Sequence, residues 1–97
     1  MFLEVVRAEY VSGYRIKLWF NNNVIKEVDL SDSLKGDVFI PLKDLNFFKR
    51  FTIKFNTIEW ENGADIAPEH LYELGVSVKF YDVFNTYFHL YKLFSYT

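Results

Sequence analysis

The fold is decided by residues 60–72, which read Trp-Glu-Asn-Gly-Ala-Asp-Ile-Ala-Pro-Glu-His-Leu-Tyr. Trp60 closes an aromatic strand, and Asn62-Gly63 is a dipeptide typical of tight turns. Pro68 favours the first turn of a helix, because a residue there needs no N–H donor within the helix. The stretch therefore predicts a strand, a chain reversal and a helix in immediate succession, with the ring of Trp60 covering the helix start.

The predicted helix is expected to pack on a sheet through Leu71 and Tyr72 and to end at Gly75, a residue typical of helix C-termini. Asp65 lies shortly before this helix, and Glu69 lies in its first turn. We expect the carboxylate of Asp65 to cap the helix by accepting hydrogen bonds from free N–H groups of the first turn. Both acidic side chains also oppose the positive end of the helix dipole. A structural role that needs no ligand therefore accounts for the motif.

Before this motif, three β-rich segments separated by short turns predict an antiparallel meander. The segments are residues 3–11, 14–20 and 24–30, and the turns are Ser12-Gly13 and Asn21-Asn22-Asn23. The second segment alternates apolar and polar side chains with the period of a half-buried strand. The side chains expected to face inward are Tyr14, Ile16, Leu18 and Phe20 from the second segment and Val24, Val28 and Leu30 from the third.

Between the meander and the motif, the pattern predicts a short helix followed by a hairpin. Leu42, Leu45 and Phe48 recur every three residues, which is typical of a short helix or 3₁₀ segment with one face packed inward. Apolar residues alternate again over residues 51–60, but their parity shifts part-way. A turn or bulge at Asn56-Thr57 explains the shift, because one extra residue exchanges the two faces of a strand.

The residues after Gly75 differ in character, because their polar side chains recur with helical spacing. Val76, Val78 and Phe80 can open this segment as a strand, and the strand propensity of Phe, Tyr, Val and Thr favours its continuation. The sustained periodicity outweighs this propensity and predicts an amphipathic helix. Its polar stripe comprises Lys79, Asp82, Asn85, Thr86, His89 and Lys92, and its apolar face comprises Phe80, Val83, Phe84, Tyr87, Leu90, Tyr91 and Phe94.

Together these elements predict an α+β fold. A small antiparallel sheet, made of a three-stranded meander plus a hairpin, is expected to carry one or two short helices over residues 1–75. Residues 76–97 are expected to form an aromatic C-terminal extension, an amphipathic helix packed on that domain or on a partner.

The aromatic content is high for a short chain, since 21% of the 97 residues are Phe, Tyr or Trp. A single domain of this size buries only about 60–65% of the surface that its unfolded chain exposes. Some ring surface is therefore left outside, and large exposed apolar patches usually mark an interface. Tyr side chains at half-buried strand positions are the alternative explanation. We expect a protein partner or self-association into a homo-oligomer.

The charge and the lack of cysteine argue against several classes of function. A formal net charge of −2 and a pI of about 5.6 do not predict the basic face of a nucleic-acid or anionic-membrane binder. Without cysteine, the chain forms no disulfide and no thiolate metal site. The N-terminus lacks the pattern of a signal peptide, and no apolar stretch reaches the roughly 18–20 residues that span a bilayer. The expected location is the cytoplasm.

The motif holds four potential metal ligands or acid–base groups, Asp65, Glu69, His70 and Glu73. A metal site needs three or four converging ligands, and a capped, solvated helix start is the simpler explanation of these side chains. The chain also has no Gly-rich phosphate loop and no Gly-x-Ser-x-Gly turn. We therefore predict no metal, no cofactor and no catalytic residue, and keep a small hydrolase that uses Asp65, Glu69 and His70 as a third alternative.

A second alternative rests on Arg7, Arg15, Lys17 and Trp19, which are placed to form a basic and aromatic strip on the outer face of the sheet. Such strips bind nucleic acid in some proteins, although charged strand residues are more often simply solvated. The strip makes a regulatory nucleic-acid-associated domain the runner-up function.

Residues 4 to about 74 resemble a family of short bacterial proteins, domain-of-unknown-function family 2442. The specific part of the resemblance is Ile58-x-Trp60-x-Asn62-Gly63-Ala64-Asp65-Ile66-x-Pro68-Glu69-x-Leu71-Tyr72. Weaker segments support it by their order along the chain: Val5, Ala8 and Tyr10, then Asp29-Leu30, then Phe39-x-Pro41-Leu42-x-Asp44 and Phe48.

The resemblance implies a small α+β domain without assigned catalytic residues, often discussed as a candidate partner in toxin–antitoxin-like gene pairs. Some longer relatives carry a helix-turn-helix domain after this unit; here the aromatic extension is too short for one, so direct DNA binding is not expected. The expected function is a non-enzymatic protein-interaction module, homo-oligomeric and antitoxin-like. The motif and interaction residues expected to matter are Trp60, Asn62, Gly63, Asp65, Pro68, Glu69 and Tyr72, to which the family assigns no role, and Phe84 and Tyr91 in the extension.

Overall fold

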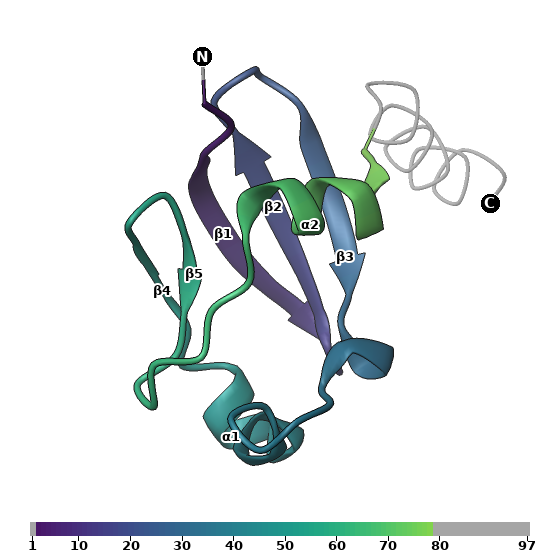
Figure 1. The fold of residues 1–97 in the computed structure, drawn as a ribbon. Coiled ribbons are helices and arrows are strands. Elements are labelled where there is room, and N and C mark those ends of the chain that lie inside the picture. Colours follow the sequence, from purple (N-terminus) through teal and green to yellow (C-terminus); the bar gives the residue numbers. More distant parts are fainter. Residues whose placement is uncertain (1, 79–97) are drawn as a thin grey trace, which may run out of the picture.

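Three strands adjacent in sequence form most of an antiparallel sheet. In the computed structural model, which describes residues 2–78, they are β1 (Val5–Ser12), β2 (Arg15–Phe20) and β3 (Ile25–Asp29) (Figure 1). Gly13 and Asn23 form the two turns with φ of +53° and +68°, a region that glycine and asparagine tolerate best. The predicted meander is confirmed, with strand ends that differ from the expected ones by one or two residues.

A fourth strand extends this sheet beyond the motif helix. Strand β6 (Val76–Ser77) pairs antiparallel with β3, with Val76 opposite Glu27, and gives the strand order β1-β2-β3-β6. The N–H of Val78 then donates a 2.7 Å hydrogen bond to the carbonyl of Ile25. The expected amphipathic helix of the extension lies outside the described residues.

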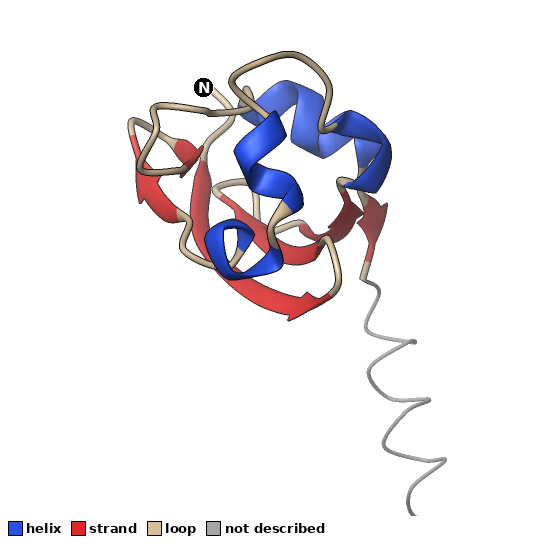
Figure 2. Ribbon diagram, turned by 90° about the horizontal axis from the view of Figure 1, so that it is seen from below, coloured by secondary structure: helices blue, strands red, loops and turns tan. Residues whose placement is uncertain are grey.

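The period-two alternation of β2 places its apolar side chains on one face of the sheet. Ile16, Leu18 and Phe20 are buried on this inner face, and α2 (Pro68–Leu74) lies across it (Figures 1 and 2). Helices and hairpin lie on that side, and no element of residues 2–78 covers the opposite, outer face, where the sheet is open (Figure 2).

Two short helical segments, and not one, follow the first 3₁₀ turn, η1 (Ser31–Ser33): η2 (Ile40–Lys43) and α1 (Leu45–Phe48). Leu42 and Phe48 are fully buried as predicted, whereas Leu45 is 39% exposed, so its expected inward orientation is wrong. Asp44 is extended (ψ 116°) between the two segments, so the three-residue spacing does not continue in one helical phase.

The predicted hairpin is present as β4 (Thr52–Lys54) and β5 (Thr57–Glu59), beside β1 (Figure 1). Its turn lies at Phe55-Asn56, one residue before the predicted Asn56-Thr57, with φ of +51° and +78°. Positive φ at both central residues is what a two-residue hairpin of the I′ type requires. This turn leaves the Phe55 side chain 82% exposed at the hairpin tip.

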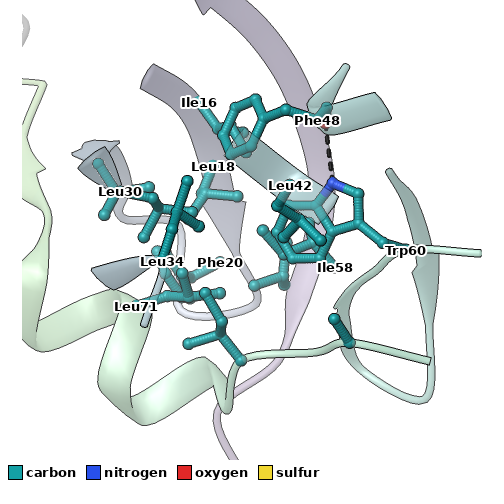
Figure 3. Close-up of a cluster of buried hydrophobic side chains, with 14 residues drawn as sticks. Ile16, Leu18, Phe20, Leu30, Leu34, Leu42, Phe48, Ile58, Trp60 and Leu71 are labelled. Atoms are coloured by element: carbon teal, nitrogen blue, oxygen red, sulfur yellow. Dashed lines mark hydrogen bonds between the residues drawn. The ribbon is translucent and has the colours of Figure 1, made fainter. Parts of the chain in front are cut away.

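The core lies between the inner face of the sheet and the helices, hairpin and loops that cover it (Figure 3). Trp60 is its largest fully buried side chain, and Leu71 brings α2 into the same cluster. The buried hydrophobic residues are Val5, Ile16, Leu18, Phe20, Val28, Leu30, Leu34, Leu42, Phe48, Ile58, Trp60, Ala64, Ile66 and Leu71.

Candidate functional site

Trp60 connects the motif to α1. Its ring is 1% exposed and packs against Phe48 and Phe51, with centroid distances of 5.7 and 6.3 Å. Its Nε1–H donates a 2.8 Å hydrogen bond to the carbonyl of Phe48 (Figure 3). The last carbonyls of a helix lack partners within the helix, and the indole N–H supplies one. Its aromatic packing and its hydrogen bond thus tie Trp60 to the α1 region, and its coverage of the start of the motif helix stays a prediction.

The Asn62-Gly63 turn is confirmed. Trp60 and Ala64 close it with a 2.8 Å N–H···O bond, and Gly63 adopts φ +86°. The Asn62 side chain uses both ends of its amide: Oδ1 accepts from the Ala64 N–H at 3.1 Å, and Nδ2 donates to the Val38 carbonyl at 2.8 Å. Asn62 thus fixes the turn and ties it to a loop 24 residues away in sequence.

Asp65 does not cap the motif helix. The N-cap residue of α2 is Ala67, with no side-chain capping bond, and Pro68 is the first helical residue. Asp65 pairs with Glu59 through an isolated antiparallel bridge beside β5, and its side chain is exposed. The expected cap at Asp65 is wrong, because this backbone pairing fixes Asp65 next to β5. The N-cap position lies two residues later, at Ala67. Asp44 is a true cap instead, since its Oδ1 accepts from the Asn46 N–H at 2.9 Å at the start of α1.

These two aspartates give a matched pair of variants. We expect Asp44→Ala to lower the free energy of unfolding by about 0.5–2 kcal/mol, the usual cost of removing an N-cap. Asp65→Ala is expected to change it by less than about 0.5 kcal/mol, as for an exposed side chain that makes no capping bond to α2. Urea denaturation followed by circular dichroism measures both. A loss for Asp65→Ala that equals the loss for Asp44→Ala would contradict the assignment of the cap to Asp44.

Tyr72 and Leu71 fix α2 on the sheet, as predicted. Leu71 is fully buried, and the Tyr72 ring meets Phe20 edge-on with a centroid distance of 5.0 Å. Lys26 Nζ lies 3.7 Å from the centroid of the Tyr72 ring and donates a hydrogen bond to the Tyr72 carbonyl. A cation at the C-terminal end of a helix also opposes the negative end of its dipole. Sequence reasoning missed Lys26, because a lysine within a strand is usually solvated.

Gly75 ends α2, as predicted, but for a different physical reason. Its φ is −73°, outside the left-handed region that commonly ends helices at glycine. A Cβ atom at this position would lie 2.9 Å from Lys26 Cβ. Glycine is therefore needed here because the end of the helix approaches β3 closely, and the chain then pairs directly with β3 as β6.

The acidic and histidine side chains of the motif do not converge. Asp65, Glu69, His70 and Glu73 are all exposed. In the part of the chain that the structure describes, no group of three or more His, Cys, Asp or Glu side chains is placed to hold a metal ion.

The outer face of the sheet carries the basic and aromatic strip expected from the sequence. The strand register aligns Arg7, Trp19 and Ile25 in one row across β1, β2 and β3. The Arg7 guanidinium lies 4.6 Å, and the Lys17 ammonium 5.0 Å, from the centroid of the Trp19 ring. Favourable cation–π contacts have this geometry.

Carboxylates neutralise most of this strip. Glu9, Lys17, Glu27 and Val76 form the neighbouring row across all four strands. Arg7 pairs with Glu9, and Arg15 Nη1 lies 3.5 Å from Glu27 Oε1.

Asp29, opposite Arg15, adds a further negative charge to this face. Its Oδ1 accepts a 2.9 Å hydrogen bond from the Ser31 N–H. This bond, a second one from the Ser31 side chain and the charge of Arg15 hold the pKa of Asp29 below its ordinary value. The outer face is therefore a surface of mixed charge around one tryptophan.

Comparison with known proteins identifies the family. The model of a family described as "Protein of unknown function (DUF2442)" matches residues 5–77. The chain belongs to this family. The match spans β1 to β6 and so includes the complete sheet of the DUF2442 domain. No curated protein and no solved structure matches the chain.

Among the helices of residues 2–78, none is long and apolar enough to cross a membrane. Phe84 and Tyr91, the interaction candidates of the extension, lie outside the residues that the structure describes.

Proposed function

We propose that this DUF2442 protein is a non-enzymatic protein-interaction module that self-associates. The observation that supports this most directly is the large apolar surface left outside the core. Phe2, Phe55 and Val76 are 87%, 82% and 74% exposed. The sequence adds eleven further apolar residues between positions 79 and 97. A surplus of exposed apolar side chains is typical of chains that bury part of their surface against another protein.

The antitoxin-like role and the bacterial cytoplasm, both expected from the sequence, belong to this proposal. A small domain with exposed rings fits a protein that covers a surface of its partner. The motif supplies rigidity in this account, because Trp60, Asn62 and Tyr72 tie three distant segments together.

Nucleic-acid binding is the second candidate, and one observation favours it: Arg7 and Lys17 flank the Trp19 ring, as in platforms on which bases stack. Phosphate contacts dominate nucleic-acid affinity, however, and they need cations that are free to meet phosphate. Arg7 and Arg15 already have carboxylate partners on the same face. A hydrolase that uses Asp65, Glu69 and His70 has less support, because these side chains are exposed and share no cleft in the described residues.

The test of the proposal is the oligomeric state of the full chain by light scattering coupled to gel filtration. We expect the wild type to be a dimer at micromolar concentration, and Phe84→Glu with Tyr91→Glu to be a monomer. Burying an exposed Phe or Leu side chain contributes about 1.5–3 kcal/mol, so two such losses are enough to dissociate a modest dimer. The matched control, Asn85→Glu with Thr86→Glu, adds the same charge on the predicted polar stripe and is expected to remain dimeric.

A wild type that stays monomeric at high concentration contradicts the proposal. Salt-sensitive binding of the isolated chain to its own promoter DNA at submicromolar concentration would favour the second candidate instead.

A further inference from the structure

We propose that residues 79–97 of one copy of the chain pack on the outer sheet face of a second copy, around Trp19, Ile25 and Val76. This inference rests on the proposed self-association and specifies its interface. The exchange is reciprocal, so that each copy contributes one extension and one sheet face, as two-fold symmetric dimers do.

The outer face has apolar surface at the place where an extension can reach it. Trp19 and Ile25 are opposite each other in the strand register, and both are half-buried. Val76 lies on the same face, one row along and at the β6 edge, with 74% of its surface exposed. The cations next to Trp19, Arg7 and Lys17, suit a partner rich in Phe and Tyr rings, because ring faces attract cations.

The direction in which the chain leaves the sheet favours a second copy as the acceptor. Strand β6 runs antiparallel to β3, and the last described bond joins the Val78 N–H to the carbonyl of Ile25, the first residue of β3. The chain therefore moves toward the end of the sheet at which the β2–β3 turn lies. To cover the outer face of its own sheet, it would have to reverse immediately.

The sequence of the extension provides no residue suited to such a reversal. Neither glycine nor proline occurs between positions 79 and 97, and these are the residues that most often mark tight turns. The sequence instead predicts one amphipathic helix for the extension, and an uninterrupted helix has no turn with which to fold back. A neighbouring copy can receive it without any change of direction.

The available area is sufficient for a stable dimer. A buried Phe or Tyr side chain contributes about 150–250 Å², so four rings of one extension bury on the order of 600–1000 Å². Two reciprocal contacts double this value and reach the range of roughly 1200–2000 Å² found in stable complexes.

The two tryptophans of the chain supply a direct test by acrylamide quenching. Trp60 is 1% exposed in the core, so Trp19 is the quenchable fluorophore. In the wild-type dimer we expect Trp19 to be protected. Protection should be lost on dilution below the dimer dissociation constant and in the Phe84→Glu, Tyr91→Glu variant. The Asn85→Glu, Thr86→Glu control should keep it.

A variant of the acceptor face tests the same contact from the other side. Val76→Lys is expected to weaken the dimer measurably, because it places a charge in the contact. Val38→Lys, at a second exposed apolar position away from the sheet, is expected to leave the stability of the dimer unchanged. Circular dichroism confirms that each variant is folded before quenching is measured.

The outcomes separate this inference from the proposed function. A dimer in which Trp19 is quenched equally in the wild type and in the Phe84→Glu, Tyr91→Glu variant overturns the inference and leaves self-association intact. A monomer in which Trp19 is protected at every concentration overturns both the self-association and the proposed packing of the extension on a second copy. It would show that the extension packs on the sheet of its own copy. A monomer with an accessible Trp19 also overturns both.

Discussion

Trp60→Ala is expected to lower the free energy of unfolding by about 3–5 kcal/mol, the range for truncating a large buried aromatic side chain. The ring is fully buried and packs against Phe48 and Phe51, so its removal leaves a cavity in the core. Small domains are stable by only about 5–15 kcal/mol, so this variant should be close to unfolding at ambient temperature. Urea denaturation followed by circular dichroism measures the loss.

Trp60→Phe separates packing from hydrogen bonding at the same position. It keeps an aromatic ring but removes the Nε1–H that donates to the Phe48 carbonyl. We expect a loss of about 1–3 kcal/mol, since a buried carbonyl then lacks its donor. Trp19→Phe is the matched control on the outer face and should cost less than about 1 kcal/mol. If Trp60→Phe were as stable as the wild type, the hydrogen bond to α1 would have no structural role.

Leu71→Ala is expected to cost about 2–5 kcal/mol, because it opens a cavity where α2 meets the sheet. Leu71 is fully buried in the core, whereas Leu74, on the same helix, is 41% exposed. Leu74→Ala therefore serves as the control and should cost less than about 1 kcal/mol.

Both leucine variants are measured by the same urea denaturation. Equal losses for the two would mean that α2 packs on the sheet through a different face than the structure shows. A measurable loss of amide hydrogen-exchange protection in β6 is also expected for Leu71→Ala, because α2 leads directly into that strand.

Local patterns along the chain were sufficient to predict the three-stranded meander. The alternation of Ile16, Leu18 and Phe20 predicts one buried face whatever covers it, because successive side chains of a strand point to opposite sides. The turns at Gly13 and Asn23 were predicted for a similar reason, since tolerance of positive φ is a property of the residue itself. Leu71 and Tyr72 followed from their place in a short helix that must bury one face.

Local patterns mispredict residues whose position is set by the surrounding structure, and Asp65 and Leu45 are the two examples. Asp65 precedes a helix in sequence, but a backbone bridge to Glu59 sets its position, and Ala67 becomes the cap residue. Leu45 fits the spacing of Leu42 and Phe48, but the extended Asp44 places it in a separate helical segment with a different phase.

The sequence by itself determined the strands, the turn dipeptide of the motif, the helix after Pro68 and the family, because each depends on residues close together in the chain. Only the tertiary structure decided which carbonyl receives the Trp60 N–H, why residue 75 must be glycine beside Lys26, and that β6 completes the sheet next to β3. Those features join segments 12 to about 50 residues apart. Their geometry is set when the whole chain packs, so no local pattern encodes it.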